Sequence, residues 1–196
     1  LIRPSNRRAR GRFLRNAIRI SGNIVAIDGR AASACVPAIG EVDRAVVGSA
    51  TSQFVCEIEK GAIRRFAEAI GDLNRLYLDE AFACAHGYRS VIAPPTFPVS
   101  LRPPEDLPWM SGVDPTRILA GEQTFVYTRP IVAGDVLSCR LHFVDVVDKR
   151  GSLGTMEVLT HELRGLDAHD KLVFTHRRLS IVRGKSSILK KTEEES

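Results

Sequence analysis

The chain has 196 residues, 44% of them hydrophobic and 26% charged, a composition typical of one globular domain with or without tails. No apolar stretch approaches the roughly 18 residues that a membrane-spanning helix needs, so we expect no membrane span. The formal charge is +5, but residues 1–30 alone carry +7, with eight arginines and one acid. The other 166 residues hold 20 basic and 22 acidic groups. The body of the chain is therefore not basic, which argues against nucleic acid as a partner.

The arginine-rich leader, residues 1–47, has three possible interpretations: a phosphate-binding arm, a transit peptide, or an extension outside the fold. It lacks an uninterrupted amphipathic period, so we expect a dispensable, disordered extension. The charged tail, residues 184–196, is expected to be disordered as well. The four cysteines include no C-x-x-C pair, which predicts reduced thiols in a cytoplasmic protein, without a disulfide framework or a metal site. They are Cys35, Cys56, Cys84 and Cys139.

The first half of the domain reads as one strand followed by helices. Residues 53–58 are a candidate strand. Apolar residues then recur at helical spacing from Ile63 to Ile70, and Gly71 ends this amphipathic helix. A second short helix is expected over residues 79–86, and a third begins within residues 93–97, where proline suits the first turn. Residues 102–115, rich in proline and glycine, are expected to form a loop.

From Gly121 onward the pattern changes to strands. Apolar and polar residues alternate from Leu137 to Phe143, and the phase then shifts around Asp145, which predicts a half-buried strand with a bulge. Further strands are expected at residues 123–129, 154–164 and 171–182. One strand, then helices, then an antiparallel meander indicates an α+β fold.

Two short motifs are the most informative features of the sequence. Residues 72–77 read Asp-Leu-Asn-Arg-Leu-Tyr, and residues 93–97 read Ala-Pro-Pro-Thr-Phe. Together they resemble the active-site segment of MaoC-like, (R)-specific enoyl-thioester hydratases and dehydratases, and in particular the N-terminal domain of FAS1-type dehydratases. The resemblance implies a single hot-dog domain over residues 48–183, in which an antiparallel sheet wraps around a central helix. We find no second copy of the motif, so a second hot dog would have to come from a homodimer or from a related chain.

The resemblance also implies site residues. The family motif Asp-x-Asn-Pro-x-His places a catalytic carboxylate at Asp72 and a catalytic imidazole at the position of Tyr77. A phenol, with an ordinary pKa near ~10, donates a hydrogen bond but is a poor base at neutral pH. Asp72 could instead close an Asx turn, Tyr77 could be a packing residue, and His86 could either replace the imidazole or cap a helix. Substrate contacts are expected at Asn74, Pro95, Thr96 and Phe97.

Two classes of function follow. The first is a hydratase or dehydratase, or a subunit of one, that acts on an acyl thioester of coenzyme A or acyl-carrier protein and needs no other cofactor. The second is a non-catalytic acyl-binding subunit whose partner supplies the Asp/His pair. A hot-dog thioesterase would need a carboxylate at the helix start, and Glu105 and Asp106 lie too far along the chain. The Pro-x-x-x-Gly-Asp turn at residues 130–135 also matches the family, and its expected role is structural.

Overall fold

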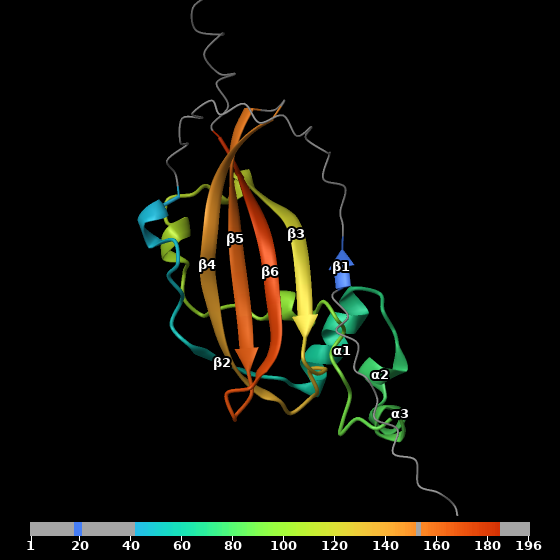
Figure 1. The fold of residues 1–196 in the computed structure, drawn as a ribbon. Coiled ribbons are helices and arrows are strands. Elements are labelled where there is room, and N and C mark those ends of the chain that lie inside the picture. The colour runs from blue at the N-terminus through green and yellow to red at the C-terminus, as the bar shows by residue number, and fades with distance from the viewer. Residues whose placement is uncertain (1–17, 21–41, 152–153, 185–196) are drawn as a thin grey trace, which may run out of the picture.

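The computed structural model describes residues 18–20, 42–151 and 154–184, which form one antiparallel sheet with helices at one end (Figure 1). Its six strands lie in the order β1-β3-β6-β5-β4-β2, so the long strands β3 to β6 lie at its centre. The strands are β1 (Ile18–Ile20), β2 (Phe54–Glu57), β3 (Ile118–Tyr127), β4 (Val136–Gly151), β5 (Gly154–Leu166) and β6 (Leu172–Arg183). The helices are η1 (Arg44–Val46), α1 (Lys60–Ala69), α2 (Arg75–Leu78), α3 (Glu80–Ala85), η2 (Phe97–Ser100), η3 (Pro108–Met110) and η4 (Pro115–Arg117). The predicted α+β order is confirmed.

Strand β4 shows how alternation and a bulge shape the sheet. Its inward residues from Leu137 to Phe143 are buried, as the alternating pattern predicts. The pairing of β4 with β5 shifts between Phe143 and Asp145, which confirms the predicted bulge. Beyond the bulge Val146 is buried and Val144 is exposed. The extra residue therefore brings the second half of the strand back into phase with the core.

The predicted helices α1 and α3 are present. Ile63 and Ala67 are fully buried on one face of α1, and Gly71 follows this helix with a φ of 71°. Ile70, expected on the same apolar face, is the C-cap of α1 and is exposed. Asp79 caps α3 by accepting a hydrogen bond from the Phe82 backbone N–H at 3.0 Å.

The segment expected to form the central helix differs from the prediction in length. It makes a single 3₁₀ turn, η2, closed by backbone bonds from Phe97 N–H to Pro94 O at 2.9 Å and from Val99 N–H to Thr96 O at 3.1 Å. Pro98 lacks an N–H, and Pro103 and Pro104 soon follow, so a longer α-helix cannot form. The segment is still packed in the core, since Phe97 is buried.

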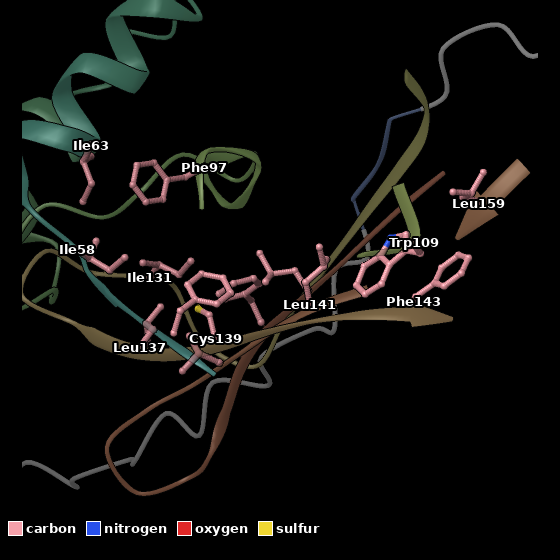
Figure 2. Close-up of a cluster of buried hydrophobic side chains, with 14 of the residues drawn as sticks. Ile58, Ile63, Phe97, Trp109, Ile131, Leu137, Cys139, Leu141, Phe143 and Leu159 are labelled. Carbon is pink, nitrogen blue, oxygen red and sulfur yellow. The ribbon is translucent and has the colours of Figure 1, made fainter. Parts of the chain in front are cut away.

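One continuous core fills the space between the sheet and this segment. Figure 2 shows Ile63 and Phe97 together at one end of the core, and Trp109, Phe143 and Leu159 at the other. The indole of Trp109 stacks on Phe143 with ring centroids 5.2 Å apart. The loop from η2 to η4 therefore covers the sheet where the family resemblance implied a helix.

Residues before Gly48 also belong to the folded unit. Val42 is buried in the core, and Arg44 forms ion pairs with Asp148 and with the fully buried Glu157. Within the leader, β1 pairs antiparallel with residues 123–125 of β3. Residues 1–17, 21–41 and 185–196 lie outside the described part, so the disorder expected there stays a prediction. Within the described ranges, no helix has the length and hydropathy needed to cross a membrane.

Candidate active site

Asp72 lies in the turn that leaves helix α1. Its backbone N–H donates to Ala67 O at 3.0 Å, and its carboxylate Oδ1 accepts from the Asn74 N–H at 3.3 Å. This is the Asx turn that the sequence allowed as one role for Asp72. The residue is exposed, so its second carboxylate oxygen remains open to solvent or to a ligand.

Asn74 is the N-cap of helix α2. Its side-chain Oδ1 accepts a hydrogen bond from the Leu76 N–H at 3.0 Å, which satisfies one of the free backbone donors at the helix start. The amide oxygen therefore has a structural task, and contact between Asn74 and substrate stays a prediction.

Tyr77, at the family's histidine position, is buried on the one-turn helix α2. Burial raises the pKa of its phenol, and the nearby charges of Asp72 and Tyr88 raise it further. The phenol is therefore protonated at neutral pH and can donate but not take up a proton. Backbone N–H bonds from Asn74 to Asp72 Oδ1 and from Tyr77 to Asn74 O hold the two predicted catalytic residues in one short segment, and their catalytic roles stay predictions.

Two hydrogen bonds fix the Ala-Pro-Pro-Thr-Phe segment, one to helix α2 through the preceding residue Ile92 and one to strand β3. The Ile92 N–H donates to Leu76 O at 3.0 Å, and the phenol of Tyr127 donates to Pro95 O at 2.7 Å. Pro95 is exposed, and Thr96 is half-buried. Phe97, in contrast, is a core residue that packs edge-on against Phe66 with ring centroids 5.4 Å apart. Of the three substrate contacts expected within this segment, Pro95 and Thr96 have the exposure that such a role needs.

His86 caps a helix, which is the structural alternative that the sequence allowed for it. It is the exposed C-cap residue of α3, its Nδ1 lies 2.8 Å from Phe82 O, and its ring packs on Phe82. This confirms the capping role that the sequence allowed. The turn at residues 130–135 is also structural, as predicted. There Asp135 accepts from the Val132 N–H and pairs with Arg89 and Arg129.

Glu105 has a backbone partner as well. Its carboxylate accepts a hydrogen bond from the Ser52 N–H at 2.8 Å, and it lies in the loop after η2. This position does not suit the water-activating carboxylate of a thioesterase. Among the residues that the structure describes, no group of three or more His, Cys, Asp or Glu could hold a metal ion.

The structure adds a groove that the sequence reasoning missed. Its volume is about 980 Å³, and it lies between the loop after η2 and the inner face of β3, β5 and β6. Polar residues occupy core-facing positions in its wall, where His161 and His176 are almost fully buried. Burial, and then the charge of Arg178, lowers the pKa of His161 to about 3 and that of His176 to about 4. Both imidazoles are therefore neutral at physiological pH.

A sequence signal for these residues did exist. His161 lies between Leu159 and Leu163 in the inward phase of β5, and His176 and Arg178 follow Phe174 in the inward phase of β6. Polar residues at core-facing positions indicate either a satisfied internal network or a binding site. The histidines show no metal-ligand spacing along the chain, so the sequence alone indicates no site at His161 or His176.

Comparison with known proteins places the chain in a family. A family model described as the FAS1-like dehydratase domain region matches residues 45–176. A UPF0336 protein of Thermobifida fusca is 37% identical over 137 residues, which cover 65% of this chain and 84% of that protein. Another UPF0336 protein, from Clavibacter michiganensis, is 37% identical over 126 residues, which cover 62% of this chain and 82% of that protein.

Solved structures agree with the fold. A solved structure named MaoC-like dehydratase aligns with a TM-score of 0.61 at 25% identity. The alignment covers 70% of this chain and 42% of that chain. The ChsH1-ChsH2 complex from Mycobacterium tuberculosis aligns with a TM-score of 0.59 at 22% identity, over 70% of this chain and 86% of that one. These likenesses confirm the hot-dog fold expected from the sequence. The chain thus belongs to the family of the FAS1-like dehydratase domain region, among the MaoC-like hot-dog dehydratases and hydratases.

Proposed function

We propose that this chain is the acyl-thioester-binding subunit of a two-chain, (R)-specific 3-hydroxyacyl-thioester dehydratase or enoyl hydratase. The observation that carries the proposal is Tyr77, a buried phenol at the position where the family places its catalytic imidazole. Hydration of an enoyl thioester needs a base for the water and an acid for the alpha carbon. The Asp72 carboxylate alone supplies at most one of these two roles.

The partner in this proposal is a related hot-dog chain that carries the complete Asp/His pair. Two of the structural neighbours are themselves complexes by title, the ChsH1-ChsH2 complex and the HadBC (3R)-hydroxyacyl-ACP dehydratase complex of Mycobacterium tuberculosis. Strand β3, which is flanked on one side only by the short strand β1, carries two exposed apolar side chains, Leu119 and Val126. A second hot dog could cover them.

The substrate in this proposal is an acyl thioester of coenzyme A or acyl-carrier protein, and no further cofactor takes part. The thioester lies beside Asp72, the exposed Pro95 and the half-buried Thr96, with the acyl chain along the groove. The described cysteines Cys56, Cys84 and Cys139 are free thiols, in keeping with a reducing compartment such as the cytoplasm.

The test is reconstitution. The chain is purified alone and together with a related hot-dog chain that has the Asp-x-Asn-Pro-x-His motif, and hydration of crotonyl-coenzyme A is followed for each sample. We expect little or no activity from the chain alone and full activity from the pair. The pair should lose that activity when the partner's motif histidine is replaced by alanine. High activity of the chain alone as a homodimer would contradict the proposal.

A further inference from the structure

Four polar side chains form a row across the inner face of the sheet, within the groove. The register of β5 and β6 places His161 directly opposite Arg178, and that of β3 and β6 places Gln123 opposite the same arginine. His176 lies two residues from Arg178 on the same face, with its Nε2 2.9 Å from Gln123 Oε1. All four residues line the groove.

Two donors in this row have no partner among the described residues. The Trp109 indole N–H donates to His161 Nε2 at 3.0 Å, so the neutral imidazole carries its proton on Nδ1. That Nδ1 and the Nε of Arg178 are both buried and unsatisfied. A buried donor without an acceptor costs free energy, and the two residues that carry these donors lie on adjacent strands and line the same groove. An acceptor held between the two side chains would satisfy both.

The groove also carries more positive than negative charge, with two arginines and one carboxylate in its lining. Arg178 forms no hydrogen bond or ion pair through its guanidinium with any described residue, and Arg102 lines the same groove. Burial, and then repulsion from Arg102, lowers the pKa of Arg178. The carboxylate of Asp106, on the exposed loop, is the one acidic group in the lining. A half-buried guanidinium without a carboxylate partner is unfavourable unless a ligand supplies one.

We propose that this groove binds a carboxylate on the distal part of the acyl chain through Arg178 and His161. The substrate class is then an acyl thioester whose acyl chain carries a free carboxylate. The inference rests on the proposed function, because the thioester end of the ligand is taken to lie near Pro95. Tyr127 bonds to Pro95 O, and Gln123 lies four residues back along β3, a distance of about 13 Å at the usual strand rise. The groove volume, about 980 Å³, is large enough for a ligand of that length.

Calorimetric titration of the full chain with dodecanoate and with methyl dodecanoate tests the site. Dodecanoate supplies the carboxylate, and the methyl ester has the same chain without the charge. We expect dodecanoate to bind more tightly, and Arg178→Met to lower its affinity by about 10- to 100-fold while the ester is unaffected. Arg177→Met is the matched control, because Arg177 lies on the opposite face of β6 and pairs with Glu162. It should leave both affinities unchanged.

Stability separates a binding role from a structural one. Replacing a half-buried, unpaired guanidinium with an apolar side chain of similar length should raise the melting temperature, whereas loss of a structural arginine would lower it. If Arg178→Met proves poorly soluble, Arg178→Gln replaces it, because this change removes the charge but keeps a polar side chain. It should lower the dodecanoate affinity in the same way.

Three results would overturn the inference. The first is equal affinity for dodecanoate and its ester, and the second is an equal loss with Arg177→Met. The third is inorganic phosphate that competes with dodecanoate in an Arg178-dependent manner, because the anion would then be a phosphate of the thioester carrier. A further titration with dodecanoyl-coenzyme A keeps the two proposals apart. Dodecanoyl-coenzyme A has no distal carboxylate, so its binding should not depend on Arg178, and a loss of its affinity in Arg178→Met would refute the carboxylate site. No binding of dodecanoyl-coenzyme A, together with Arg178-dependent binding of dodecanoate, would refute the proposed function and leave the carboxylate site standing.

Discussion

Gly165 is where β5 passes closest to a buried ring of β6, and Gly165→Ala should destabilise the fold. A Cβ atom built on Gly165 would lie 2.2 Å from Phe174 Cε1 and within 3 Å of two further ring carbons. The ring of Phe174 is fully buried and cannot move into solvent. Overpacking of this kind typically costs about 1–3 kcal/mol. For a chain of this size that cost corresponds to a melting temperature about 2 to 12 °C lower.

The assay is urea unfolding followed by fluorescence, with Gly61→Ala as a matched control. Gly61 is an exposed residue in α1, and its added Cβ would meet only the mobile end of Arg65, 3.1 Å away. The same substitution should therefore stabilise the protein there by about 0.5–1 kcal/mol. Phe174→Leu should recover part of the loss in the Gly165→Ala background, because the smaller side chain vacates the overlapping space. An unchanged urea midpoint for Gly165→Ala would refute the register assigned to β5 and β6.

Two further predictions concern buried ionisable groups. Arg44→Met should lower the free energy of unfolding by about 2–3 kcal/mol because it leaves Glu157 buried and unpaired, with the carboxylate of Asp148 directly opposite on β4. Partial solvent exposure of Arg44 moderates the cost. Arg44→Met combined with Glu157→Gln should cost less than Arg44→Met alone, and additive losses in urea unfolding would argue against the pair. Folding lowers the pKa of His161 to about 3 and that of His176 to about 4. Between these pKa values and about pH 6.5, the unfolded chain therefore binds more protons than the native one. Stability should therefore be lost as the pH falls from about 6.5 towards 4, and His176→Gln should reduce that slope by up to about 1.4 kcal/mol per pH unit; equal slopes in both proteins would contradict it.

The sequence predicted the sheet well because its signals are local. The alternation from Leu137 to Phe143 and the phase shift at Asp145 fix both the inward face of β4 and its bulge. The helix expected after Pro94 became a 3₁₀ turn because Pro98, Pro103 and Pro104 deny it backbone donors and helical geometry. Proline therefore both suggested the helix start at residues 93–97 and, at the later positions, ended the turn.

The site was predicted in part. Asp72 and Tyr77 lie in one short segment, where backbone bonds join Asn74 to both of them, and their catalytic roles stay predictions. The groove residues His161 and Arg178 could not be grouped in advance, because they lie 17 positions apart on separate strands and meet only through the register of β5 and β6. Phe97 was expected at the substrate, but its packing against Phe66 depends on a tertiary contact that no local pattern reveals.

The gain of hydratase activity in Tyr77→His tests the central claim most directly, that this chain lacks only the imidazole of the catalytic pair. The initial rate of crotonyl-coenzyme A hydration is measured for the unmodified chain, for Tyr77→His, and for Tyr77→His combined with Asp72→Asn. General acid–base assistance contributes about 10² to 10⁴-fold in rate, so the new histidine should raise a weak or absent activity well above background. The added Asp72→Asn change should abolish that gain without altering the melting temperature. High activity in the unmodified chain that survives Tyr77→Phe would contradict the account.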